Sequence, residues 1–151
     1  MSNCRRVTGY TFIELLIVLA VVSIATAFVM SGFRNYARYQ EYNQAVSTVR
    51  AVLNDAHLKA RSSEGGQAHG VKVLSGSLVI YPGTTYSAGN SANKTTTFNN
   101  VSLVPSFAGG VTAVTFANLT GLPSLPGVIQ VVGTRRVATT SVEITAAGGI
   151  Q

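Results

Sequence analysis

Side chains able to perform acid–base, nucleophilic or metal chemistry are scarce in this 151-residue chain. It has two histidines, His57 and His69, one aspartate, Asp55, and one cysteine, Cys4. Two isolated histidines do not supply the ligands of a zinc site. Asp55 and His57 are two positions apart, so on a helix they point to different faces, and nothing marks a nucleophile for a triad. We therefore predict no catalytic residue, no metal and no cofactor, and we expect both histidines to be surface or part-buried residues.

Glu14 is the charged residue whose position demands an explanation. It lies near the start of a block, residues 12–30, in which the only other polar residues are Ser23 and Thr26. Such a block is about as long as a bilayer core is thick. A carboxylate inside hydrocarbon costs about 2.5–3.5 kcal/mol even on lenient insertion scales. A snorkelling or protonated glutamate would be a structural explanation, whereas a charged partner would be a functional one.

Two ordinary readings of this N-terminus leave Glu14 unexplained. A basic patch with Arg5 and Arg6 followed by an apolar run is typical of a secretory signal, and Ala25-Thr26-Ala27 offers an A-x-A cleavage site. In that case residues 1–27 would be removed and a soluble β-domain exported. The block could also be an uncut anchor. Neither needs a carboxylate, and the apolar run continues past the A-x-A site to Met30.

The stretch GYTFIELLIVLAVV, residues 9–22, resembles the class III signal of type IV pilins and pseudopilins. In that family a prepilin peptidase cuts after the glycine and leaves the apolar helix in the product. The resemblance implies cleavage between Gly9 and Tyr10, N-methylation of Tyr10, and an assembly role for Glu14, which becomes the fifth residue. The family usually has phenylalanine at the new N-terminus, so Tyr10 departs from the pattern. Cys4 would leave with the leader.

The family also implies partners and a location. We expect the Glu14 carboxylate to meet the new N-terminal amine of a neighbouring subunit, because desolvated opposite charges attract strongly. The expected partners are other pilin or pseudopilin subunits, the prepilin peptidase, an inner-membrane assembly platform and, before assembly, the lipid bilayer. The expected location is the bacterial inner membrane, with the head on the periplasmic side, and then the filament.

Apolar spacing predicts one continuous helix over residues 11–62. Between residues 39 and 60 the apolar positions recur every three or four residues, which makes one stripe along a helix. These positions are Tyr39, Tyr42, Val46, Val49, Leu53, Ala56 and Ala60. Burial against the head or a neighbouring subunit is the favoured role of Tyr36, Tyr39 and Tyr42, and a place in an aromatic belt at the membrane interface is the alternative. We place the domains at 1–9 (leader), 10–33 (transmembrane or filament-core half of the helix), 34–62 (amphipathic half) and 63–151 (β-rich head).

The remainder of the chain reads as strands separated by turns. Ser62, Ser63, Gly65 and Gly66 predict the end of the helix, and Ser75-Gly76 predicts a tight hairpin. Strands are expected near 68–74, 77–81, 96–104, 111–117, 127–132 and 136–145, with loops at 83–93 and 122–127. The predicted fold class is therefore α+β, the pilin fold, with a long N-terminal helix followed by an antiparallel β-sheet domain.

Weaker motifs resemble the GspH/FimT group of minor pilins and pseudopilins. They are the helix end from Asn54 to Ser62, the segment F-x-x-L-T-G-L-P from Phe116 to Pro123, and the late glycines Gly148 and Gly149. Members of that group with a role in natural transformation bind DNA through arginines toward the C-terminus. The resemblance makes Arg135 and Arg136 candidate DNA contacts, with Lys72 and Lys94 as helpers, through salt-sensitive phosphate contacts. A solvated hairpin turn is the alternative role of the two arginines.

These observations predict a non-catalytic structural subunit of a type IV pilus or a type II secretion pseudopilus. The alternatives are a minor pilin at the filament tip that binds DNA or a surface ligand, and the exported β-domain described above. Beyond residue 34 the chain has eight basic and four acidic side chains, a mild excess that permits contact with nucleic acid without requiring it.

Overall fold

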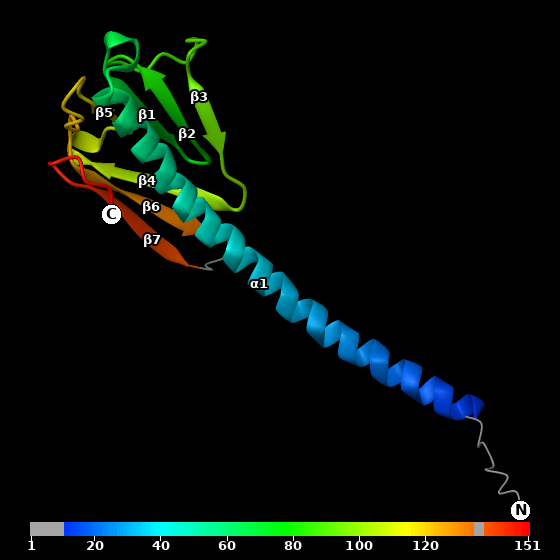
Figure 1. Cartoon of the computed structure of the whole chain (residues 1–151). Helices are drawn as coiled ribbons and strands as arrows, with labels where there is room; N and C mark the ends of the chain where they lie inside the picture. The colour runs from blue at the N-terminus through cyan, green and yellow to red at the C-terminus, as the bar shows by residue number, and fades with distance from the viewer. Residues whose placement is uncertain (1–10, 135–137) are drawn as a thin grey trace, which may run out of the picture. The chain divides into compact units, whose positions relative to one another are not determined.

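A computed structural model gives the fold of the chain and describes residues 11–134 and 138–151, leaving out the side chains at 29, 31, 32, 34 and 35 (Figure 1). One long helix is followed by seven strands and two short 3-10 turns, η1 (Glu64–Gly66) and η2 (Ala108–Gly110), in the described residues. The helix is α1 (Phe12–Arg61). The strands are β1 (His69–Leu74), β2 (Ser77–Pro82), β3 (Lys94–Thr97), β4 (Val101–Phe107), β5 (Ala113–Phe116), β6 (Gly127–Gly133) and β7 (Thr139–Ile144).

Helix α1 confirms the predicted continuous helix to within one residue at each end. It ends where Ser63 adopts the left-handed conformation, with φ of 54°. Gly65 and Gly66 follow with φ of 66° and 70°, conformations that glycine adopts without steric cost. The Ser/Gly cluster therefore ends the helix as the sequence predicts.

The strands form two antiparallel sheets instead of the single sheet that the sequence suggested. Four strands pair in the order β3-β2-β1-β5 and three pair in the order β4-β6-β7. Strands β1 and β2 are joined by the expected two-residue hairpin, because Leu74 pairs with Ser77 across Ser75-Gly76. The two sheets meet where the Leu103 N–H donates to the Ser75 carbonyl at 2.7 Å.

The single strand predicted over 96–104 is wrong, and this error explains the second sheet. The segment contains β3 and β4, which belong to different sheets. Between them Asn100 has φ of 63°, a left-handed conformation that interrupts an extended strand. The sequence TTTFNNVSLV has no glycine or proline to mark that break, although asparagine tolerates this conformation better than most residues.

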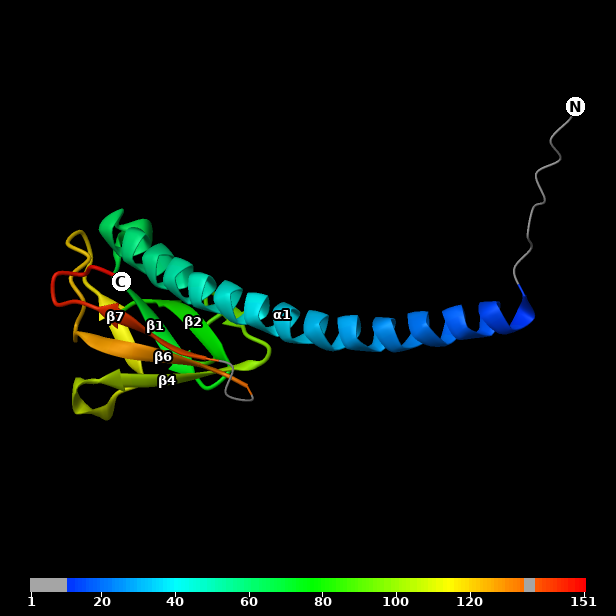
Figure 2. The same ribbon diagram turned by 90° about the horizontal axis from the view of Figure 1, so that it is seen from below.

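The chain divides into two compact units, residues 1–37 and 38–151. In the C-terminal unit, the part of α1 from residue 38 onward lies over both sheets (Figure 2). Its stripe is buried at Tyr42, Ala45, Val49, Val52, Leu53, Ala56 and Ala60, beside apolar residues of six strands. The Tyr42 hydroxyl donates to the Val131 carbonyl at 3.3 Å and so ties the helix to β6.

The predicted stripe is correct in most positions and wrong at one edge. Tyr39 is 50% exposed and Val46 is only partly buried, whereas Ala45 and Val52, which were not predicted, are buried. A helix turns by 100° per residue, so a stripe read at spacings of three and four can drift to either side of the true contact line. Tyr42 confirms its predicted burial, while Tyr36 and Tyr39 are exposed in the single chain.

Candidate functional site

The first turn of α1 carries Glu14 and a helix cap that the sequence analysis overlooked. The Glu14 N–H donates to the Thr11 hydroxyl at 3.3 Å, and the Leu15 N–H donates to the Thr11 carbonyl at 3.2 Å. Thr11 and Glu14 have the T-x-x-E spacing of a capping box, which was the available signal. Only half of that box is formed in the described residues, because no hydrogen bond joins the Glu14 carboxylate to the Thr11 backbone.

Glu14 differs from the other two polar residues of the apolar block. The Ser23 hydroxyl donates to the Leu19 carbonyl at 2.7 Å, and the Thr26 hydroxyl donates to the Val22 carbonyl at 2.7 Å. Both side chains are thus satisfied within their own helix. The Glu14 carboxylate is exposed and makes no ion pair or hydrogen bond within the part of the chain that the structure describes.

The surface around Glu14 is apolar on every side of the helix. Each large apolar side chain described between residues 12 and 28 is 49–77% exposed in the single chain. A helix that is apolar all round belongs inside a membrane or a larger protein assembly. Contiguous apolar surface of this size rarely stays in contact with water, because its burial yields about 25 cal/mol per Å². This segment therefore requires a cover that the single chain does not provide.

No helix in the described residues combines the length and the apolarity of a membrane span. The predicted transmembrane role of residues 10–33 remains a prediction. Gly9 and Tyr10, the predicted cleavage and methylation residues, lie outside the described residues, so their roles also stay predictions.

The structure does not bring the predicted basic residues together. Lys72 pairs with Val79 across β1 and β2, whereas Lys94 pairs with Ile80 across β2 and β3. Neighbouring positions along a strand point to opposite faces of a sheet, so the two lysines lie on opposite faces. Arg135 and Arg136 lie outside the described residues.

Each lysine also has a partner in its own neighbourhood. The Lys94 ammonium is 3.5 Å from the Asp55 carboxylate on α1. The Lys72 ammonium donates to the Thr112 hydroxyl at 2.6 Å and lies 5.8 Å from the centroid of the Tyr86 ring. DNA binding by these four residues stays a prediction, and among the described pair there is no shared basic surface.

His57 has a structural role that the sequence analysis missed. Its ring lies 5.4 Å from the Phe116 ring. Gly121 and Gly148 close around it, since a Cβ at Gly121 would lie 2.6 Å from His57 Nε2 and one at Gly148 would lie 3.3 Å from the same atom. Both glycines have positive φ. The T-G-L-P and late-glycine motifs therefore meet at one histidine near the end of α1.

The surroundings of His57 oppose its protonation. Burial lowers the pKa of the imidazole, and the nearby Arg61 guanidinium lowers this pKa further. His69, in contrast to its predicted surface or part-buried position, is only 6% exposed. It shares with Val71 the face of β1 that packs on the core, and for this reason it is buried.

One comparison with known proteins finds a match to the N-terminus, and another finds a similar fold. Residues 4–30 match a family model described as the prokaryotic N-terminal methylation motif. The fold is similar to the crystal structure of the type IV minor pilin FimU of Pseudomonas aeruginosa strain PAO1, with a TM-score of 0.59 and 18% sequence identity. The similarity covers 77% of this chain and 90% of that chain. The comparison with curated proteins found no match.

A prepilin-type methylation motif joined to a pilin fold supports a type IV pilin or pseudopilin, as the sequence predicted. The α+β fold class, a long N-terminal helix followed by antiparallel sheets, is confirmed. The narrower GspH/FimT assignment stays a prediction.

Proposed function

We propose that this chain is a structural subunit, a minor pilin or pseudopilin, of a type IV pilus or a type II secretion pseudopilus. Its precursor is a single-pass inner-membrane protein. The prepilin peptidase cuts it between Gly9 and Tyr10, Tyr10 is N-methylated, and an inner-membrane assembly platform adds the subunit to the filament. The β-rich part of the chain then faces the outside, and the apolar part of α1 lies in the filament core.

The observation that carries this proposal is the isolated carboxylate of Glu14. Ser23 and Thr26 are satisfied by their own helix, so they can be buried in any apolar surrounding at little cost. Glu14 has no such partner among the described residues, so burying it alone would be expensive. Cleavage after Gly9 creates an α-amino group four residues before Glu14. The same group on an adjacent subunit is a partner of the right charge.

Such a pair would fix the register between subunits more than it would add net stability. Desolvating two charges costs much of what their attraction returns, whereas removing one member leaves the other buried and unpaired. The N-terminal end of a helix also favours a negative charge, because its free N–H groups carry partial positive charge. Before assembly, the carboxylate of Glu14 is thus stabilised by the N-terminal end of its own helix. After assembly, it favours a neighbouring subunit that brings a positively charged amine to it.

The mass of the mature N-terminus tests the processing step. We expect mass spectrometry of the protein from its native cells to find a product that begins with N-methyl-Tyr10. Substitution Gly9→Val should leave the full precursor uncut. A product beginning at Phe28 would contradict the proposal, because it would mean that the helix is removed as an ordinary secretory signal.

Variants of Glu14 test the assembly step separately. Loss of one member of a buried charge pair costs roughly 3–5 kcal/mol, so Glu14→Gln and Glu14→Leu should each lower the amount of subunit in sheared filaments by at least roughly tenfold. Ser23→Ala is the matched control on the same helix and should assemble like the parent. Normal cleavage of the Glu14 variants, checked by mass, shows that only assembly is affected. Assembly of Glu14→Leu at the parent level would overturn this role.

A further inference from the structure

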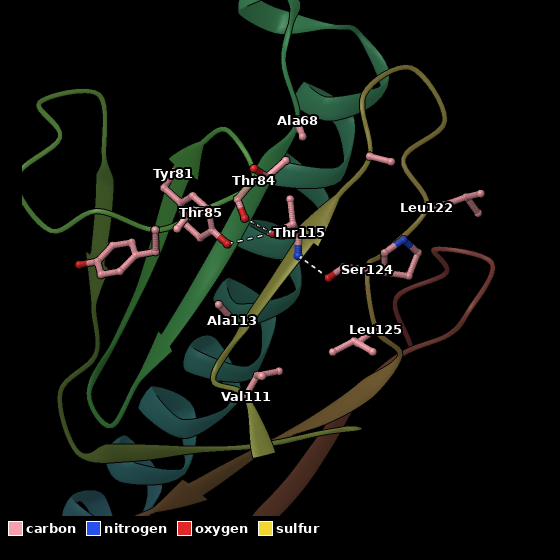
Figure 3. A pocket seen from close by; sticks show the side chains of 13 residues that line it. Ala68, Tyr81, Thr84, Thr85, Val111, Ala113, Thr115, Leu122, Ser124 and Leu125 are labelled. Atoms are coloured by element: carbon pink, nitrogen blue, oxygen red, sulfur yellow. Dashed lines mark hydrogen bonds between the residues drawn. The ribbon is translucent and has the colours of Figure 1, made fainter. Parts of the chain in front are cut away.

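A groove of about 600 Å³ lies over the outward face of β5 in the C-terminal unit (Figure 3). Val114 and Phe116 of this strand pack in the core with α1, so Ala113 and Thr115 point to the opposite face and line the groove. Its walls come from two loops, with Thr84 and Thr85 on one side and Leu122, Ser124 and Leu125 on the other (Figure 3). A cavity of this size is typical of a site for a small molecule.

The hydroxyl groups in the middle of the groove are already engaged with one another or with the backbone. The Tyr81 and Thr115 hydroxyls are 2.9 Å apart and share a hydrogen bond. The Ser124 hydroxyl accepts from the Thr115 N–H at 3.1 Å. Alanine, valine, leucine and proline side chains make up most of the rest of the lining. An occupant of the groove therefore meets mainly apolar surface, which favours an apolar body.

One charged group, the Lys72 ammonium, lies at the margin of this groove. Lys72 pairs with Ala113 across β1 and β5, so its side chain leaves the sheet on the groove side. The ammonium donates to the Thr112 hydroxyl at 2.6 Å and lies 5.8 Å from the centroid of the Tyr86 ring. Tyr86 lines the groove, and Thr112 lies between the lining residues Val111 and Ala113. The ammonium is therefore next to the Val111 end of the groove.

Lys72 differs from the other partly buried base of the C-terminal unit. Within residues 38–134 and 138–151, Lys59 and Lys72 are the lysine or arginine side chains that are partly buried. Lys59 forms an ion pair with Glu64 at 2.6 Å, whereas Lys72 forms none with the described residues. A partly buried charge without a counter-ion loses hydration without compensation. An anion beside Lys72 would offset that loss.

The walls of the groove supply no such anion. Between Val73 and Thr134 the only charged side chain is Lys94, which lies on the other face of the sheet from Lys72. The groove therefore combines one uncompensated positive charge at its end with an apolar interior. A ligand that is complementary to both parts carries a negative charge at one end of an apolar body.

We propose that this groove binds a small amphipathic anion, a carboxylate attached to an aliphatic chain of medium length. The carboxylate pairs with the Lys72 ammonium beside Thr112, and such charge-assisted hydrogen bonds are stronger than neutral ones. The aliphatic chain lies over Ala113 toward Leu125, where burial of its apolar surface favours binding. This site goes beyond the filament role and does not depend on it, because all its residues lie within residues 68–125.

Octanoate tests the proposal on the full chain in dodecyl maltoside micelles at neutral pH, by isothermal titration calorimetry. We expect saturable binding beyond the heat that empty micelles give. Octylammonium has the same chain and the opposite charge, and it should bind at least about tenfold more weakly because its charge would meet Lys72. Acetate has the carboxylate without the chain and should also bind at least about tenfold more weakly. Absence of saturable octanoate binding, or equal binding of octanoate and octylammonium, would overturn the proposal.

Variants of the chain locate the binding. Lys72→Met removes the charge, keeps an unbranched side chain and should weaken octanoate binding at least about tenfold. Lys94→Met is the matched control on the other face of the same sheet and should bind like the parent. Leu125→Ala removes part of one wall and should weaken binding severalfold, which covers the case in which Lys72→Met perturbs the fold.

Unchanged octanoate affinity of Lys72→Met, or of Leu125→Ala where Lys72→Met does not fold, would overturn the proposal. An equal loss of affinity in Lys94→Met would do the same, because it would place the anion elsewhere. None of these results would affect the processing or Glu14 experiments, so the two proposals can fail separately.

Discussion

The two parts of helix α1 are both rich in apolar residues, yet the chain covers only one of them. From residue 38 onward the apolar stripe is buried against two sheets, with Val49, Leu53 and Ala56 at 0% exposure. Between residues 12 and 28 the large apolar side chains are 49–77% exposed. Apolar burial favours folding in the first case. In the second case the same free energy is available only to a membrane or to neighbouring chains.

The two parts of the helix also differ in where their polar side chains find hydrogen-bond partners. In the C-terminal unit the Tyr42 hydroxyl reaches a backbone carbonyl of β6, and Asn100 donates to the Glu41 carboxylate at 3.0 Å. In the N-terminal unit Ser23 and Thr26 bond to their own helix, and Glu14 has no described partner. These two polar groups of the C-terminal unit are thus satisfied within the chain, whereas the Glu14 carboxylate has no partner among the described residues.

The largest expected effect on stability is that of a buried leucine, and an exposed leucine on the same helix serves as its control. Leu53→Ala removes a fully buried side chain and should lower the free energy of unfolding of the C-terminal unit by about 2–5 kcal/mol. Leu16→Ala, at a position 49% exposed, should change it by less than about 0.5 kcal/mol. Urea unfolding followed by the near-ultraviolet circular dichroism of the tyrosines measures both. Equal destabilisation by the two substitutions would contradict the distinction between the halves of the helix.

A comparable effect is expected at Gly121, the glycine that closes on His57. Gly121→Ala places a Cβ 2.5 Å from Arg61 Cγ and 2.6 Å from His57 Nε2, at φ of +68°. Left-handed backbone costs an L-residue about 1–2 kcal/mol, and the added crowding costs about 1–3 kcal/mol. Gly83→Ala also has positive φ but meets nothing within 4 Å, so it isolates the backbone part. The same urea experiment should find Gly121→Ala the more destabilising; the reverse order would show that Gly121 does not pack on His57.

The same histidine should make the stability of the C-terminal unit depend on pH, and this effect should be smaller than that of either substitution above. The pKa of His57 in the folded chain lies below its ordinary value near 6.5, so the unfolded chain binds a proton more readily. The stability of the C-terminal unit should therefore be full above about pH 6.5 and decline as the pH falls below it. Thermal melts of the parent and of His57→Gln between pH 7 and 5.5 test this. Identical slopes would mean that another group causes the decline.

The smallest expected effect is a change in DNA affinity. Lys72 and Lys94 lie on opposite faces of one sheet, so they do not form a joint DNA-binding surface, and the test concerns Arg135 and Arg136. If these two arginines contact phosphates, Arg135→Ala with Arg136→Ala should weaken binding in a gel-shift assay and flatten its salt dependence, whereas Lys94→Ala should have little effect. An unchanged affinity of the double variant would discard these arginines as DNA contacts.

Several features of the fold and of the candidate site could be predicted from particular residues. The leader motif around Glu14, the end of the helix at Ser63 and Gly65, and the hairpin at Ser75-Gly76 were predictable because each depends on local chemistry or on a few neighbouring residues. The Thr11 cap was also readable from its T-x-x-E spacing and was missed. The break at Asn100 was not readable with the same certainty, since its left-handed conformation depends on the two sheets that it joins.

The sequence by itself determined that residues 12–30 form an apolar segment with one misplaced carboxylate, because composition and helical period are properties of the chain alone. Only the tertiary structure decided that β3 and β4 belong to different sheets, that Gly121 and Gly148 meet at His57, and that Lys72 and Lys94 point apart. It alone decided the groove along β5 as well. Each of these features depends on which strand pairs with which and in what register, and a register is selected by the packing of the whole core.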